Sequence, residues 1–349
     1  MKKLTKIGAS ALAGSLVATA ASAGSLSVGG TWEVTGEFTN GSGSSTMMAL
    51  SNNGNPFGSK GNLSFSGSGE TDWGTASFFM FTADGQASVS SHSQTLDMGD
   101  MGTIGFDQGT GAFGLGTIDD KMPTAYEEVW NGTTATTTDI LDANGGSAGV
   151  FGYKNTFMDT LINIEYAPSV GSGDATDGGN SHVATVQDGT SLNFALTNSS
   201  LMDGLTVGVG YGETSYDRAA SDAANIDTES TTGFITYSIG AVTIGYQSNY
   251  TSGSASTANT TIGANDVEMY GIAFNVNDAL SISYQDYDNT YKKRGSETGD
   301  GITQNASGIQ AAYTMGGATL RISDVSVDNS GGTSGNSEDR TEISLLMAF

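Results

Sequence analysis

The chain has 349 residues with 51 glycines, no cysteine and two histidines, and 12 lysines and arginines stand against 37 acids for a formal charge of −25. This acidic balance excludes nucleic acid as a partner, because phosphates demand a basic face. Without cysteine there is no disulfide scaffold or thiol catalysis, and two histidines make a multi-histidine metal site or a Ser-His-Asp enzyme hard to build. Catalysis is therefore not expected.

The first 23 residues have the pattern of an export signal. Lys2, Lys3 and Lys6 precede an uncharged stretch, and residues 21–23 read ASA, which is an A-x-A cleavage site. A membrane anchor is the alternative, but the segment is short and built of small residues. We predict that residues 1–23 are a cleaved signal peptide and that residues 24–349 form the mature domain.

From residue 26 onward, apolar and polar residues alternate. Leu26 and Val28 flank Ser27, and Trp32 and Val34 flank Glu33. A period of two indicates strands with one apolar and one polar face, and no apolar run after residue 24 approaches the ~18 residues of a spanning helix. The pattern recurs sixteen times, near residues 25–38, 61–71, 74–83, 92–99, 102–107, 148–156, 160–167, 188–198, 204–216, 228–239, 241–251, 265–276, 280–290, 304–315, 318–328 and 339–349.

The connections between these strands alternate in length. Long polar loops occupy residues 40–59, 169–187, 252–264, 291–303 and 329–338, and short turns lie between them. Short turns at one rim and long loops at the other are typical of an outer-membrane barrel. The predicted fold is an all-β, transmembrane antiparallel barrel of sixteen strands with both termini at the short-turn rim. A secreted β-sandwich is the alternative, although a sandwich has no reason to separate its loops by length.

The last strand supports this interpretation. Thr341, Ile343, Leu345, Met347 and Phe349 share one face. A strand of this kind that ends in phenylalanine resembles the assembly signal of Gram-negative outer-membrane proteins.

The segment 98–106 reads MGDMGTIGF and resembles the GDFGTLTLG hairpin between strands four and five of the general diffusion porins. This family forms sixteen-stranded trimeric barrels in bacterial outer membranes. The resemblance implies a passive diffusion channel, a homotrimer, a barrel-assembly machinery that recognises Phe349, and lipid and surface glycolipid as surroundings. It also implies that the longest loop follows strand five, folds into the barrel and narrows the pore.

Residues 108–147 are the longest connection and occupy that position. Apolar groups that could anchor the loop against a wall are Phe113, Leu115, Ile118, Met122, Tyr126, Val129 and Trp130. The predicted constriction residues are Asp119, Asp120, Lys121, Glu127, Glu128, Asp139 and Asp142. A run of charges on its own often means only a solvated surface loop.

The lumen wall departs from the family, because the chain has no arginine before Arg218 to build a basic cluster opposite the loop. The inward residues with charge are predicted to be Glu33, Glu165, Lys60, Lys154, Arg321 and Arg340. We place Lys60 and Arg340 near the long-loop rim, and Lys154 and Arg321 near the short-turn rim, which leaves Glu33 at mid-height. The lumen is therefore predicted to be net negative and to favour cations.

Two weaker signals concern ligands outside the pore. Residues 292–294 read KKR in a predicted loop, where they could touch phosphates of surface glycolipid. Oxygen ligands for Ca²⁺ could come from Asp174, Asp177, Asp217 and Asp222, although no EF-hand spacing is present. No other cofactor is expected.

Several functions remain open at this stage. One is a substrate-selective channel on the same scaffold, and another is a structural or adhesive surface barrel with a plugged lumen. A barrel hydrolase is disfavoured by the missing histidines.

Overall fold

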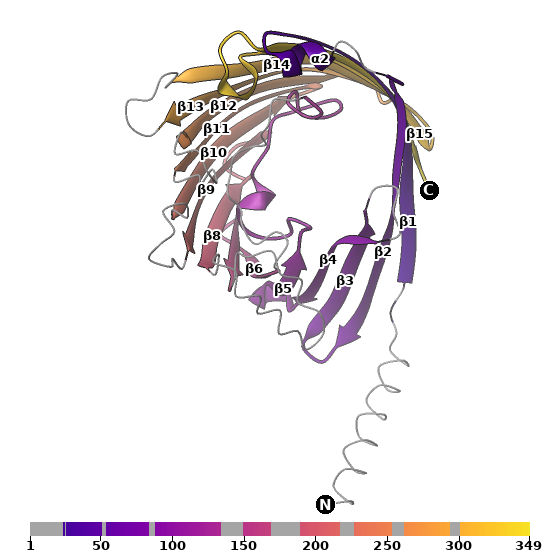
Figure 1. The fold of residues 1–349 in the computed structure, drawn as a ribbon. Helices are drawn as coiled ribbons and strands as arrows, with labels where there is room; N and C mark the ends of the chain where they lie inside the picture. The colour runs from indigo at the N-terminus through magenta and orange to yellow at the C-terminus, as the bar shows by residue number, and fades with distance from the viewer. Residues whose placement is uncertain are drawn as a thin grey trace, which may run out of the picture.

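The computed structural model describes residues 24, 26–50, 54–83, 88–133, 149–168, 189–216, 227–252, 262–293 and 301–349. Sixteen strands make up a closed barrel, in which each strand pairs with its neighbours in sequence and the first pairs with the last (Figure 1). Their bounds are β1 Leu26–Ser42, β2 Phe57–Thr71, β3 Gly74–Thr82, β4 Val89–Asp97, β5 Thr103–Gln108, β6 Val150–Phe157, β7 Thr160–Ala167, β8 Gly189–Asn198, β9 Leu205–Tyr216, β10 Thr228–Ile239, β11 Val242–Ser252, β12 Ile262–Asn275, β13 Leu280–Lys293, β14 Ile302–Met315, β15 Ala318–Asp328 and β16 Ser337–Ala348.

The predicted fold class is confirmed, and strand bounds agree with the sequence pattern to within a few residues. Two predictions of loops are wrong. The segment 40–59 contains a short helix, α2 (Ser45–Leu50), and the ends of β1 and β2. Lys292 and Lys293 extend β13 instead of lying in a loop, because β12 and β13 keep pairing beyond the alternating stretch, up to Ile262 opposite Lys293.

Barrel closure depends on the two ends of the chain. β1 and β16 pair over twelve residue positions, from Thr31 opposite Ala348 to Ser42 opposite Ser337. The backbone N–H of Phe349 donates to the carbonyl oxygen of Gly30 at 3.0 Å, and the N–H of Gly30 donates back at 3.2 Å. The terminal residue thus completes the ladder, which leaves the sheet no free edge.

The alternation sorts side chains between the two faces of the wall. Leu26, Val28 and Trp32 point outward and are 67%, 60% and 45% exposed, whereas Glu33 points inward and is 5% exposed. An apolar band around the outside of a barrel needs an apolar environment, because its exposure to water is unfavourable. No helix among the described residues is long and apolar enough to cross a membrane.

The hairpin between β4 and β5 is the segment that resembles the porin motif. A turn of 3₁₀ helix, η1 (Gly99–Met101), joins the strands, and Gly99 and Gly102 have φ of 64° and 86°. A side chain at Gly102 would place its Cβ 2.6 Å from the carbonyl oxygen of Lys154. Both glycines are therefore required by the turn.

We expect a far-UV circular dichroism spectrum dominated by β-structure in detergent, and faster gel migration before boiling than after it. The reason is that a closed ladder has no edge strand from which unfolding can start. Identical migration of boiled and unboiled samples, or a largely helical spectrum, would contradict the closed barrel.

Candidate functional site: the loop inside the barrel

The chain turns into the barrel directly after β5. Asp107, near the end of that strand, is 2% exposed, and its carboxylate accepts hydrogen bonds from the backbone N–H groups of Thr110 at 3.0 Å and Ala112 at 2.9 Å. A buried carboxylate with several N–H partners fixes the direction of the chain. The next described segment, residues 109–133, lies within the ring of strands (Figure 1).

Inward side chains of the wall hold the backbone of this segment. Its N–H groups donate to them in chain order, from Gly114 to Asn163 at 3.0 Å, from Leu115 to Asn193 at 2.8 Å, from Lys121 to Gln247 at 2.8 Å, from Ala125 to Ser283 at 2.9 Å, and from Val129 to Gln285 at 3.1 Å. A segment that is mostly irregular has few partners of its own for buried N–H groups, so the wall must supply them. Amides and hydroxyls on β7, β8, β11 and β13 do so.

Glycines in the wall make room for the apolar side chains of the loop. A Cβ at Gly152 would lie 1.9 Å from the Phe113 ring, and one at Gly210 would lie 2.3 Å from Leu115. Phe113 and Leu115 are fully buried as a result. The predicted anchors are confirmed as buried, except that Tyr126 is only partly covered.

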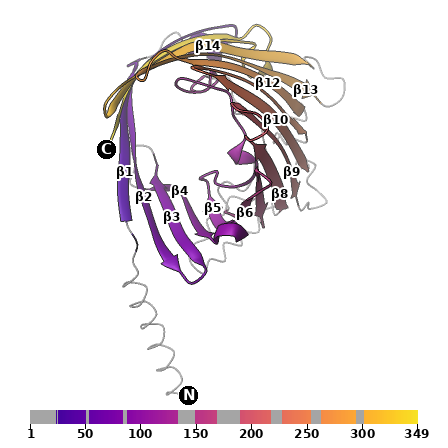
Figure 2. The same cartoon turned by 180° about the vertical axis from the view of Figure 1, so that it is seen from behind.

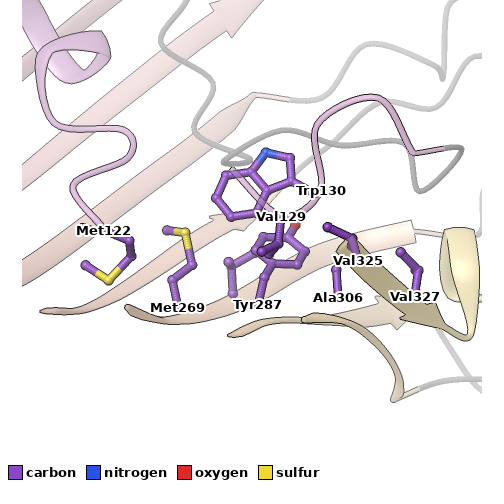
Figure 3. Close-up of a cluster of buried hydrophobic side chains, with 9 residues drawn as sticks. Met122, Val129, Trp130, Met269, Tyr287, Ala306, Val325 and Val327 are labelled. Carbon is purple, nitrogen blue, oxygen red and sulfur yellow. The ribbon is translucent and has the colours of Figure 1, made fainter. Parts of the chain in front are cut away.

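A second apolar contact lies further along the loop (Figure 3). Met122, Val129 and Trp130 pack on inward residues of β12 to β15, namely Val267, Met269, Tyr287, Ala306, Val325 and Val327. The rings of Trp130 and Tyr287 are 4.5 Å apart between centroids. The sequence analysis did not identify the wall residues of this contact. Their signal is that they are apolar although their position in the alternating pattern points them into the barrel.

Close to this second apolar contact, residues 126–131 of the loop reach a cluster of charges on β16, β15 and β1. The Arg340 guanidinium, 5% exposed, pairs with Glu127 of the loop at 3.1 Å, with Glu37 at 3.4 Å and with Glu342. It also donates to the carbonyl oxygen of Asn131 at 2.8 Å. One arginine therefore joins the end of the described loop to the wall.

Tyr126 lies beside this cluster. Its hydroxyl is 3.2 Å from a carboxylate oxygen of Glu33 and within hydrogen-bond distance of Glu342. The Arg321 guanidinium lies 4.3 Å from the centre of the Tyr126 ring and pairs with Glu33, and Lys60 is 3.8 Å from Glu33.

Arg340 lies near the long-loop end of β16 and Arg321 near the short-turn end of β15, as predicted. The predicted separation of these basic groups from Glu33 is wrong, because Arg321 and Lys60 pair with Glu33, and both arginines contact the loop at residues 126–127. Long arginine and lysine side chains extend along the wall, and the inserted loop bridges the remaining height.

Burial shifts the acidity of the loop groups. Burial together with a hydrogen bond to Glu128 raises the pKa of Asp120 to about 8. Burial also raises the pKa of Glu127, although the Arg340 guanidinium opposes that shift, and it raises the pKa of Tyr126 to about 12. At neutral pH, Asp120 is therefore largely protonated and Tyr126 remains a hydrogen-bond donor.

The remaining predicted residues divide into two groups. The Lys154 amine lies 5.3 Å from the centre of the Phe113 ring. Glu165 points inward but is buried beneath the loop, where the Asn193 side-chain amide donates a hydrogen bond to it at 3.2 Å. The predicted residues outside the described part are Asp139, Asp142, Asp174, Asp177, Asp217, Asp222 and Arg294. Among the described residues, no group of three or more His, Asp or Glu side chains could hold a metal ion.

Comparisons with known proteins show the same architecture. OmpT, an outer membrane protein of Vibrio cholerae, is 12% identical, with 93% of this chain and 98% of that chain covered and a TM-score of 0.64. An anion-selective porin from Comamonas acidovorans is 11% identical over 93% and 99%, with a TM-score of 0.61. Salmonella typhi OmpF, in a complex with daunomycin, is 13% identical over 93% and 98%, with a TM-score of 0.61.

No protein-family model matches the chain, and no curated protein sequence matches it significantly. The shared property is therefore the fold. The chain has the closed, sixteen-stranded barrel of the porins.

We expect Gly152→Val to displace the loop, because the new side chain would occupy the space of the Phe113 ring. Trypsin should then cleave after Lys121 about ten times faster than in the unaltered barrel, since that bond is held against β11. The matched control is Gly233→Val, where a Cβ would have no neighbour closer than 3.9 Å. Equal protection in both variants would show that this contact does not hold the loop.

Proposed function

We propose that this chain is a passive, water-filled channel of the Gram-negative outer membrane, through which small hydrophilic solutes and ions diffuse. One observation carries the proposal. The barrel is apolar outside and polar inside, and its loop after β5 is fixed within the ring by the wall. A loop that crosses part of a barrel interior reduces its cross-section without closing the sheet.

The chain ends fit this location. Residues 1–23 act as the cleaved export signal, which leaves residues 24–349 as the mature protein. Phe349 is the assembly signal recognised by the barrel-assembly machinery, and its backbone pairing with Gly30 makes the last residue part of barrel closure.

The outer surface suits lipid and a second copy of the chain. Leu26, Val28 and Ile343 are exposed on the outer faces of adjoining strands β1 and β16. We propose a homotrimer in which these side chains are buried between subunits, in line with the resemblance to trimeric porins. Lys292, at the loop end of β13, pairs with Asp266 at 2.7 Å and is a candidate contact for glycolipid phosphates.

The loop is the proposed constriction, and its charge favours cations. Between residues 119 and 128 it carries four acids, Asp119, Asp120, Glu127 and Glu128, against Lys121 alone, although Asp120 is largely protonated at neutral pH and Glu127 is paired with Arg340 of the wall. Inside a narrow lumen with low-dielectric walls, their field is screened less than on an open surface, where the Debye length is ~8 Å. Fold likeness does not decide the sign of selectivity, since one of the similar porins is anion-selective.

The test of this function is single-channel conductance and zero-current potential across a KCl gradient. We expect a conducting, cation-preferring channel whose cation-to-anion permeability ratio falls about two- to threefold in Glu127→Gln/Glu128→Gln. Gln keeps the side-chain shape and removes two lumen charges.

The control for that variant is Glu213→Gln/Glu229→Gln, which removes two exposed charges from paired positions on the outer face of β9 and β10. It should leave the potential nearly unchanged. Anion preference in the unaltered channel would overturn the electrostatic part of the proposal, and absence of conductance would favour a plugged surface barrel.

Selectivity should also depend on pH. Raising the pH from 7 to 9 crosses the pKa of Asp120 at about 8 and adds a negative charge to the loop. Cation preference should therefore increase over this range, and Asp120→Asn should abolish most of the increase, because the amide does not titrate. The check is the zero-current potential measured at both pH values. An equal increase in the variant would assign the titration to another group.

A further inference from the structure

Two phenylalanine rings stand on the inner face of β3. In antiparallel sheets, residues that are directly opposite point to the same side. Phe79 lies opposite Ser66 on β2 and Ser93 on β4, and Phe81 lies opposite Ser64 and Ser91. Ser64 and Ser66 have the same parity as Lys60, whose amine pairs with the inward Glu33, so both rings face the lumen.

The two rings are stacked and partly exposed. Their centroids are 6.1 Å apart, their planes differ by 23°, Phe79 is 36% exposed and Phe81 is half-buried. Elsewhere in the lumen, the apolar side chains of Phe234, Val267 and Met269 are buried. An apolar surface left open to a polar lumen is unfavourable unless something occupies it at times.

The side chains directly opposite the pair on β2 and β4 are uncharged and carry hydroxyl groups. Four serines flank the rings, Ser64, Ser66, Ser91 and Ser93, and Ser77 and Thr95 continue the same face. Serine hydroxyls donate and accept hydrogen bonds, and they are too short to cover the faces of the rings. Two apolar faces edged by hydroxyl groups therefore stand together on one wall.

Most wall contacts of the described part of the loop, residues 109–133, lie away from β3. The hydrogen bonds of this part reach β7, β8, β11, β13, β14 and β1, and its ion pair with the wall reaches β16. β3 is eight strands from β11 in the closed order, and Figure 2 shows β2 to β4 across the ring from β8 to β13. Phe79 and Phe81 thus face most of the described part of the loop across the lumen.

We propose that Phe79 and Phe81 form a binding platform for the sugar rings of neutral saccharides. This inference rests on the proposed channel function and names a solute class for it. A pyranose ring presents an apolar C–H face, which packs on an aromatic ring, and an edge of hydroxyl groups, which pair with the flanking serines. A purely apolar solute would leave those serine hydroxyls without partners, and a small inorganic ion gains nothing from the rings.

Weak binding at such a platform would assist passage. A site inside a channel must attract the solute enough to draw it in and release it readily. Two phenyl faces and a few neutral hydrogen bonds provide a contact of that strength, and no buried charge has to be desolvated.

The experiment measures interruption of the K⁺ current by maltotriose in a planar bilayer. We expect the trisaccharide to reduce the current of the unaltered channel in a concentration-dependent manner. Phe79→Ala/Phe81→Ala should weaken the apparent affinity about tenfold, which corresponds to ~1.4 kcal/mol, while the K⁺ current persists. Phe79→Trp/Phe81→Trp, which keeps aromatic faces at both positions, should retain the block.

The matched control is Phe78→Ala, which removes the same side chain from the outer face of the same strand, where Phe78 is 41% exposed. It should behave like the unaltered channel. Equal block in the Phe79→Ala/Phe81→Ala variant, or no block of a conducting unaltered channel, would overturn the platform. Stronger block by phenethylamine than by maltotriose, lost in the same variant, would overturn the saccharide assignment.

Absence of conductance would refute the proposed channel function, but it would not refute saccharide binding by Phe79 and Phe81. Calorimetric titration of the detergent-solubilised barrel with maltotriose separates the two, because it needs no current. Binding that is weakened in Phe79→Ala/Phe81→Ala and unchanged in Phe78→Ala supports the platform, and absence of binding refutes it. Heat-modifiable migration of each variant verifies that the barrel is folded.

Discussion

The closed hydrogen-bond ladder of the wall is the constraint on which the rest of the structure depends. Once β16 pairs with β1, the strand backbones form a ladder without a free edge, and each side chain is assigned to the outside or the inside by its parity alone. The outer positions in the apolar band around the barrel must be mostly apolar. The inner positions do not have to be apolar, so their side chains can bind water in the lumen or contact an inserted segment.

The inner face divides these two tasks between different parts of the barrel. On β6 to β15 it offers amides, apolar side chains and glycines, which satisfy the backbone of the loop and accommodate its apolar groups. On β2 to β4 it offers short hydroxyl side chains and the Phe79–Phe81 pair. The asymmetry follows from the loop, because only the wall beneath it has to supply partners for buried N–H groups.

The sequence predicted what depends on local periodicity. The runs around Leu205 and Tyr270 alternate strictly, so their strands and outward faces follow from parity, and the apolar groups of the loop predicted its anchors. Contacts that depend on distant pairing could not be predicted in this way. The approach of Arg340 to Glu127 joins residues 213 positions apart, and it requires both barrel closure and the path of the loop. The protonation of Asp120 requires its burial against Glu128, which no spacing in the sequence shows.

The glycines beneath the loop also bear on how the barrel can vary. Gly152, Gly210 and Gly245 each leave a space that a loop side chain fills, and none of the three positions contributes a side chain to the outer face. Adding even a methyl group at one of them would push the loop away from that part of the wall and further into the barrel interior, which would narrow the passage. Trimming a loop anchor, such as Phe113, would let the loop settle back and widen it. The width of the passage thus depends on how closely the side chains of the loop pack on the glycines of the wall. Related chains can therefore differ in permeability while the number of strands, their register and the outer surface stay the same.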